Sequence, residues 1–284
     1  WAGALYAASS SDRSFTFGSV SLEVESTNWN YFRPFVARVD GSGNFTWASS
    51  VTPGDSYNNV LQGMVVQSDG SVEILMRTYG TTTLGSHTTS SSTFHYILGS
   101  LNESGNWTGA SKIVSESPAG FDSTYDSAMM QKTSDGDLIV VMWLDDDGRQ
   151  INVSGSTHWF NESFTYDTRT SWTGTCSDTM LTFRLNGANH SAEDSRKDCL
   201  INEGGENAHY YSQILVDDSD RTWLFLGTRD SYLGYHNRVL RLDSDLNLDF
   251  EQFLNYADNI VNGHMIDWDD VAFDPDGNVL ASIY

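Results

Sequence analysis

Acidic residues gather in short turns of this 284-residue chain, where they offer the hard oxygen ligands that calcium prefers. The clearest series alternates along one segment and consists of Asp243, Asp245, Asn247 and Asp249. Leucines stand between these residues, as in a strand edge, and the glycine and glutamate of a calcium loop are missing at its sixth and twelfth positions. The pattern therefore predicts either a calcium site at these four residues or a solvated hairpin turn, in which Asp and Asn are common.

Paired carboxylates are a second possible source of chemistry, because glycosidases use two of them about 5 to 10 Å apart. The candidate acids precede or begin expected strands, and they are Asp126, Asp267, Asp269 and Asp270. The chain holds 38 Asp and Glu, so position alone selects none of them. Its seven histidines, among them His209 and His264, form no zinc-binding spacing. A carbohydrate-active enzyme is accordingly the alternative reading of this sequence.

Three glycosylation sequons coincide with expected hairpin turns, at Asn44, Asn106 and Asn189. We expect these asparagines to share one turn position in three successive repeats, where a glycan would project into solvent. Asparagine also suits turns for conformational reasons, so the placement has a purely structural explanation as well.

The two cysteines, Cys176 and Cys199, lie close together in sequence and outside any metal-binding or redox motif. An even count in a chain rich in Ser, Thr and Asn favours one disulfide in an oxidising compartment. Two buried thiols in a cytosolic protein are the alternative.

The charge of the chain limits its partners. Only 15 Lys and Arg oppose the 38 Asp and Glu, which gives a formal net charge of −23. Coulomb repulsion therefore disfavours nucleic acid, and no apolar run approaches the ~20 residues that membrane insertion requires. Such an acidic surface is typical of a protein that works at high salt, where the repulsion between carboxylates is screened. The alternative is that the charge simply keeps the protein soluble.

The elements that must position these residues are β-strands. Short branched or aromatic runs bounded by Asp, Gly and Ser turns occur throughout, whereas helical periodicity is sustained nowhere. One unit of four expected strands recurs, with strands that include residues 64–66, 72–77, 95–98 and 107–114 in its clearest copy. The same order returns from Ala128, with a long insertion, and again from Ser212.

Tandem units of four antiparallel strands predict a β-propeller, because a lone blade cannot bury its two faces. We therefore expect an all-β fold with about four blade units in a single domain spanning residues 1–284. The expected units are about 1–57, 58–122, 123–205 and 206–261, with closing strands at 262–284.

The first repeats resemble a known family. The segments Phe17-Gly18-Ser19, Phe35 to Asp40 and Gly43 to Ala48 are similar to the SBBP-type β-propeller repeat, which runs "FGS…FVAKLD…GN..WA". The likeness covers about residues 1–115 and weakens later. It implies a propeller fold in an extracellular or surface protein, and it implies no catalytic residues.

The ends of the chain carry incomplete repeats, one without its first strand and one without its later strands. Because unpaired strand edges are liabilities, we expect other strands to cover them. Pairing of Val271 to Phe273 with the N-terminal strands would close the ring, and this is favoured over head-to-tail addition of a second copy.

Together these observations predict a secreted or surface-displayed module for binding, adhesion or assembly, without enzymatic activity. Its expected partner is a glycan, a protein ligand or a second copy of itself.

Overall fold

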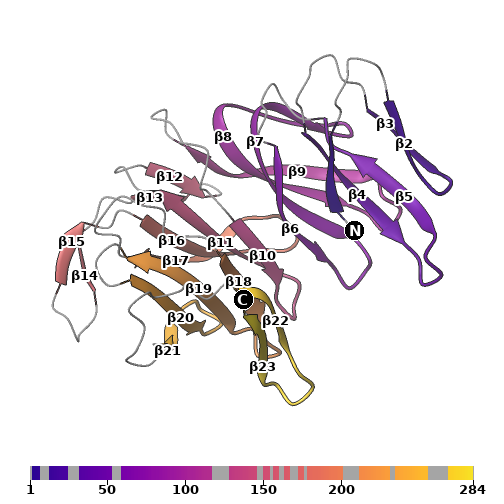
Figure 1. Ribbon diagram of the computed structural model, residues 1–284. Coiled ribbons are helices and arrows are strands. Elements are labelled where there is room, and N and C mark those ends of the chain that lie inside the picture. The colour runs from indigo at the N-terminus through magenta and orange to yellow at the C-terminus, as the bar shows by residue number, and fades with distance from the viewer. Residues whose placement is uncertain are drawn as a thin grey trace. The chain divides into compact units, whose positions relative to one another are not determined.

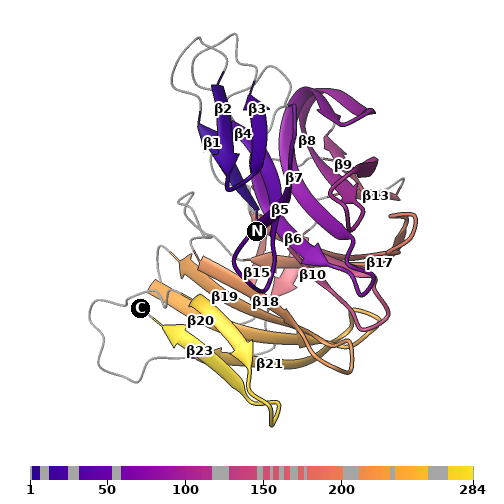
Figure 2. The same cartoon turned by 90° about the vertical axis from the view of Figure 1, so that its right-hand side faces the viewer.

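The computed structural model describes the chain as strands joined by tight turns (Figures 1 and 2). The described residues are 2–6, 13–24, 32–52, 59–116, 128–145, 150–153, 156–159, 163–166, 172–175, 178–200, 211–230, 234–254 and 268–283. Two compact units divide the chain, namely Trp1–Ser123 with Ile151–Ser156, and Thr124–Gln150 with Thr157–Tyr284. Within the described ranges, no helix has the length and apolar character needed to cross a membrane.

The first sheet of the N-terminal unit has three strands in the order β1-β4-β5. Its strands are β1 (Ala2–Tyr6), β4 (Phe32–Val39) and β5 (Phe45–Ser50). A separate hairpin of β2 (Arg13–Phe17) and β3 (Val20–Val24) packs Leu22 against Phe35 and Ala37 of this sheet. Within the described residues this sheet has three strands, which agrees with the expectation that the first repeat lacks one strand.

The second sheet contains the four expected strands and two more. In sequence order the four are β6 (Val60–Val66), β7 (Val72–Leu84), β8 (His87–Leu101) and β9 (Trp107–Glu116). The additional strands, β12 (Gln150–Val153) and β13 (Ser156–Trp159), come from the insertion in the next repeat. Because β12 pairs with β9, it covers backbone groups that would otherwise form an open sheet edge.

The expected spacer between the second and third strands of this sheet is itself strand. β7 and β8 form one long hairpin that closes at Gly85 and Ser86 and appears as a curled ribbon in Figures 1 and 2. Its tip folds back over its own sheet, since a side chain at Gly99 would meet Leu84 at 2.3 Å. Gly85 takes a φ of +58° at the first turn position, which is the glycine requirement of a type II′ hairpin turn.

The second unit holds two sheets of four antiparallel strands each, in sequence order. The third sheet comprises β10 (Ala128–Lys132), β11 (Leu138–Asp145), β16 (Asp178–Leu185) and β17 (Ala192–Leu200). The fourth comprises β18 (Tyr211–Val216), β19 (Thr222–Asp230), β20 (Gly234–Leu242) and β21 (Leu248–Leu254). The unit also contains two hairpins, β14 (Ser163–Tyr166) with β15 (Trp172–Thr175) and β22 (Trp268–Phe273) with β23 (Val279–Ile283).

Hydrophobic clusters join neighbouring sheets inside each unit. In the first unit, Val36 and Val51 pack with Ile74, Met76 and Leu84 of the second sheet. In the second unit, the third and fourth sheets share a cluster that contains Val141, Met180, Leu224, Leu240 and Leu246. The C-terminal hairpin packs on the other face of the fourth sheet, through Val271 and Val279 against Phe225 and Val239. Alternating strand residues thus bury both faces of the fourth sheet.

These features confirm an all-β chain that contains repeated four-stranded antiparallel sheets. In the structure β22 pairs with β23. The propeller, its single domain and the pairing of Val271 to Phe273 with the N-terminal strands stay predictions.

Candidate functional site

The hairpin turns are braced by their first residue. Asp40 Oδ1 accepts hydrogen bonds from the backbone N–H groups of Ser42 and Asn44, both at 2.9 Å. The backbone and side-chain hydrogen bonds donated by Asn44 hold the pKa of the Asp40 carboxyl below its usual value. The same two-bond brace recurs at Asn102, Asp243 and Asp274. The repeated Asp and Asn residues are therefore structural elements of the turns.

Two of the carboxylates predicted to bind calcium, those of Asp243 and Asp249, have hydrogen-bond partners in the protein. Asp243 Oδ1 accepts the backbone N–H of Asp245 at 3.0 Å and that of Asn247 at 2.8 Å. Asp249 Oδ1 accepts Arg241 Nε at 2.8 Å. Among the residues that the structure describes, no three His, Cys, Asp or Glu side chains gather in a group that could hold a metal ion. Calcium binding at Asp243, Asp245, Asn247 and Asp249 stays a prediction.

The three sequon asparagines are exposed, but they do not share one turn position. Asn44 and Asn106 each close their turn, because their carbonyl oxygens accept the N–H of the first turn residue. In the third sheet Ser191 has that role, since the N–H of Asn186 bonds to the oxygen of Ser191. One extra residue in this turn shifts Asn189 away from the equivalent position. The expectation of equivalence is thus wrong for Asn189, while glycosylation at all three sites stays a prediction.

Other predicted site residues fall wholly or partly outside the described part. Cys176 lies outside it, and the backbone of Cys199 pairs with that of Thr179 in the third sheet. The disulfide stays a prediction, which mass spectrometry of unreduced protein tests.

The candidate acids and histidines are also mostly outside the described residues, namely Asp126, Asp267, His209 and His264. Asp269 and Asp270 belong to β22, whose backbone alone is described at these positions.

An arginine and a tryptophan of the first sheet hold a turn of the second. Arg38 and Trp47 are cross-strand neighbours on β4 and β5. Arg38 Nη1 donates to the carbonyl oxygen of Glu103 at 3.0 Å, and Trp47 Nε1 donates to the same oxygen at 2.9 Å. Two residues later in that turn, a side chain at Gly105 would lie 2.5 Å from the Trp47 ring. Glycine here allows the turn to approach the indole closely.

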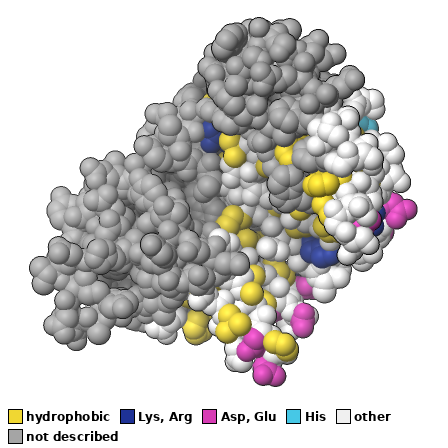
Figure 3. Space-filling model, turned by 45° about the vertical axis from the view of Figure 1, so that its right-hand side comes forward, with side chains coloured by type: hydrophobic (Ala, Val, Ile, Leu, Met, Phe, Trp, Pro, Cys, Tyr) yellow, Lys and Arg dark blue, Asp and Glu magenta, His cyan; other side chains and the backbone are white. Residues whose placement is uncertain are grey.

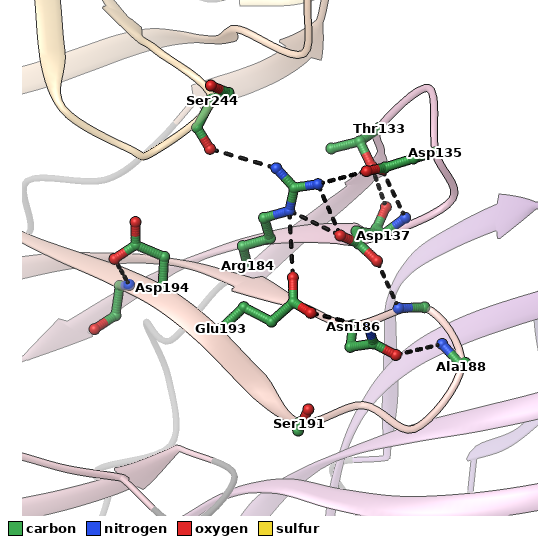
Figure 4. Close-up of polar contacts among 12 residues, drawn as sticks. Thr133, Asp135, Asp137, Arg184, Asn186, Ala188, Ser191, Glu193, Asp194 and Ser244 are labelled. Carbon is green, nitrogen blue, oxygen red and sulfur yellow. Dashed lines mark hydrogen bonds and ion pairs between the residues drawn. The ribbon is translucent and has the colours of Figure 1, made fainter.

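An equivalent arginine joins the third sheet to the fourth (Figure 4). Arg184 Nη1 donates to the carbonyl oxygen of Ser244 at 3.4 Å, and Ser244 occupies the turn position that Glu103 has in the second sheet. Asp135 and Asp137 orient the guanidinium at 2.8 and 2.9 Å. Burial alone would lower the pKa of Arg184, but these carboxylates and Glu193 outweigh it and raise that pKa. The arginine therefore stays charged within the contact.

A second contact joins the turns between the first and second strands of the third and fourth sheets. Asp220 accepts hydrogen bonds from the backbone N–H of Ser134 at 2.6 Å and from its hydroxyl at 2.9 Å. Asp220 has a φ of +58°, at the position where the equivalent turns carry Gly136 and Gly277. The two contacts thus join the adjacent sheets of this unit at the same end of their strands, since the β10–β11 and β16–β17 turns lie at one end of the third sheet.

The fourth sheet repeats the arginine and aromatic pair of the first. Arg241 and Phe250 are cross-strand neighbours on β20 and β21, as Arg38 and Trp47 are on β4 and β5. The guanidinium of Arg241 lies over Trp223 at 5.1 Å and over Phe250 at 5.6 Å. The hydrogen bond to Asp249 raises the pKa of Arg241. Phe250 nevertheless remains 38% exposed.

Sequence reasoning missed these arginines, although the repeats contain a signal for them. Arg38, Arg184 and Arg241 each stand two residues before the Asp or Asn that opens the turn between the third and fourth strands. Superposition of the repeats on that Asp or Asn would have placed all three at one position. Their common role needed the structure, because the acceptor belongs to the next sheet.

No protein-family model matches this chain, and a search of curated proteins finds no match. The similarity to the SBBP-type repeat stays a prediction.

Proposed function

We propose that this chain is a β-propeller module of an exported or surface-displayed protein, and that it acts by binding or assembly without catalysis. The observation that carries the proposal is the repeated contact between neighbouring sheets. Arg38 and Arg184 each donate to the same carbonyl position of the next sheet in their unit. The polar residues that recur along the chain thus serve to join repeats, which is characteristic of repeat scaffolds.

Surface features support an extracellular binding role. Asn44, Asn106 and Asn189 are exposed in hairpin turns, where an oligosaccharide could be attached without disturbing the fold. Aromatic and aliphatic side chains reach the surface beside acidic ones on the face drawn in Figure 3. We propose a neutral glycan, a protein ligand or a second copy as the partner, since a net charge of −23 disfavours polyanions.

The test compares binding with turnover on the same sugars. Labelled protein is applied to a glycan array, and the unlabelled protein is incubated with chromogenic glycosides of the same sugars. We expect binding to one or more of the sugars on the array and no release of the chromophore. Hydrolysis that Asp269→Asn or Asp270→Asn abolishes would contradict the proposal and support the carbohydrate-active alternative.

Material from the natural source tests the location. We expect its intact mass to exceed that of the bare polypeptide, with glycans mapped to Asn44, Asn106 or Asn189. A mass that equals the bare chain would remove the sugar-based support for an exposed location.

A further inference from the structure

The turn between β16 and β17 contains a dipeptide with a chemistry of its own, Asn186-Gly187. The side-chain carbon of an asparagine and the backbone nitrogen of the next residue can close a five-membered ring. Glycine leaves that nitrogen unhindered, because it has no side chain. In the described part of the chain, Asn186 is the one asparagine that glycine follows, so its sequence is the one most prone to spontaneous deamidation.

The reaction needs no reagent other than water. The backbone nitrogen of Gly187 loses its proton and attacks Cγ of Asn186, ammonia leaves, and a cyclic succinimide remains. Water then opens the ring at either of its two carbonyl carbons. One opening gives aspartate and the other gives isoaspartate, in which the main chain contains one additional methylene group. Both products carry a new carboxylate.

The folded turn restrains the attacking nitrogen. The N–H of Gly187 donates to Asp137 Oδ1 at 2.9 Å, so a negative charge keeps the proton on the nitrogen that must lose it. A side chain at Gly187 would lie 2.2 Å from the carbonyl oxygen of Gly136, so the backbones of the two turns are in close contact. This approach limits rotation of the Gly187 peptide. The packing that requires glycine at this position therefore also protects the labile dipeptide.

The asparagine side chain is restrained as well (Figure 4). Its Nδ2 donates to Glu193 Oε1 at 2.9 Å. Its Oδ1 accepts the backbone N–H of Ala188 at 3.0 Å and that of Asn189 at 3.2 Å. Both ends of the amide are thus held, and ring closure has to break these bonds as Cγ becomes tetrahedral.

The two products fit the turn unequally. Asp40 and Asp243 open the equivalent turns and brace them through Oδ1, so an aspartate at position 186 preserves the brace. Isoaspartate lengthens the main chain and moves the following peptide away from its acceptor on Asp137. Because Asp137 also binds Arg184, this displacement disturbs the contact with the fourth sheet.

We infer that Asn186 is a deamidation site that the folded third sheet protects, with Asp137 as the principal protecting residue. Opening of the sheet releases the Gly187 nitrogen, and the isoaspartate formed there prevents the turn from closing again. A transient opening thereby becomes a permanent loss of the contact between the third and fourth sheets. This inference does not depend on the proposed binding function.

Peptide mapping by mass spectrometry, at mildly alkaline pH with and without denaturing urea, tests the protection. We expect deamidation of Asn186 to be faster in urea by about tenfold or more, because only the unfolded chain exposes the dipeptide. Asn262-Gly263 lies outside the described residues and reports how fast the same dipeptide reacts in the same urea sample. Equal rates at Asn186 with and without urea would overturn the inference.

Two substitutions in one turn test the role of Asp137. Asp137→Ala removes the acceptor of the Gly187 N–H and should accelerate deamidation of the folded protein by about tenfold. Asp135→Ala is the matched control, because Asp135 also binds Arg184 but leaves the bond to Gly187 in place. Circular dichroism checks that both variants are folded. Equal acceleration by the two variants would show that lost stability sets the rate, and it would overturn the role of Asp137.

A substitution at Glu193 keeps the inference testable if Asp137→Ala does not fold. The side chain of Glu193 is 40% exposed, so Glu193→Ala should be tolerated. It releases Nδ2 of Asn186 and should accelerate deamidation of the folded protein severalfold. An unchanged rate would contradict the protection by the side-chain bonds.

Refolding tests the consequence of the reaction. Protein kept in urea until Asn186 has reacted is returned to buffer, and the folded and misfolded fractions are separated by size. We expect isoaspartate at position 186, mapped by enzymatic methylation, to concentrate in the misfolded fraction, whereas Asn186→Asp folds normally. Equal amounts of isoaspartate in the two fractions would overturn the irreversible step.

Discussion

Single residues at left-handed turn positions show how the repeats diverge. Gly105, Gly136 and Gly277 occupy such positions, where an L side chain is strained. Asp220 and Leu246 adopt the same conformation with side chains, and each gains a contact to the neighbouring sheet. The strain is therefore offset by tertiary contacts.

Substitutions at Asp220 separate the strain from the contact. Asp220→Ala loses both hydrogen bonds with Ser134 but keeps the strained backbone, and we expect a loss of about 1 to 3 kcal/mol in the free energy of unfolding. Asp220→Gly loses the same bonds and relieves the strain, so it should be the more stable of the two by about 1 to 2 kcal/mol. Urea titrations of both variants measure the difference, and a less stable glycine variant would contradict this explanation.

Asp217 should make stability depend on pH in the acid range. Burial alone would raise the pKa of its carboxyl, but hydrogen bonds from Trp223 Nε1 and from the backbone of Arg221 and Ser219 outweigh burial and lower it. A lowered pKa in the folded state stabilises the protein above the unfolded value of about 3.9, and this contribution is lost as pH falls through the folded pKa. Asp217→Asn should therefore destabilise the protein at pH 7 and have a shrinking effect below about pH 4. A constant difference across denaturant titrations at several pH values would refute the assignment.

At the scale of elements, strands were predictable and their partners across sheets were not. The period-two runs and the Asp, Asn and Gly turns predicted repeated units of four strands, and the four-stranded third and fourth sheets confirm this. The β7–β8 hairpin and the addition of β12 to β9 were missed. The β7–β8 hairpin is rich in Thr and Ser, which occur in both strands and loops. Only the packing of its tip over its own sheet decides between the two.

The first unit offers a matched pair of glycines to test the contact between sheets. Gly105 and Gly43 have similar φ values of +80° and +84°, but only Gly105 faces a ring. Gly43→Ala should cost about 1 to 2 kcal/mol from backbone strain alone. Gly105→Ala should cost about 1 to 3 kcal/mol more, because its methyl group overlaps Trp47.

A double variant completes this test. Trp47→Ala in the Gly105→Ala background removes the overlap, so the two substitutions should cost less together than the sum of their separate effects. Unfolding by urea, followed for all the variants, gives the coupling, and additive effects would show that the contact is absent in solution.

At the scale of the whole molecule, charge dominates. With 38 acidic against 15 basic residues, the folded state concentrates negative charge that an unfolded chain would spread out. Arg184 and Arg241 are among the few cations, and their carboxylate partners Asp137 and Asp249 neutralise part of the charge locally.

The melting temperature should therefore rise with NaCl at pH 7. Between 0.01 and 1 M salt the Debye length falls from about 30 to about 3 Å, which screens repulsion among exposed carboxylates. The same salt series near the isoelectric point, at about pH 4.3, is the control and should show a much smaller effect. A melting temperature that falls with salt at pH 7 would show that attractive ion pairs outweigh the repulsion.

The sequence by itself determined the all-β character, the repeated unit of four strands and the turns that open with Asp or Asn. These are local properties, since side-chain alternation and turn conformation depend on neighbouring residues. Only the tertiary structure decided that Arg38 and Arg184 bind a carbonyl of the next sheet, that Leu246 is buried where other turns carry glycine, and that Asn189 is not equivalent to Asn44. Each of these depends on residues far apart in sequence, or on one inserted residue, and such contacts form only when the sheets pack together.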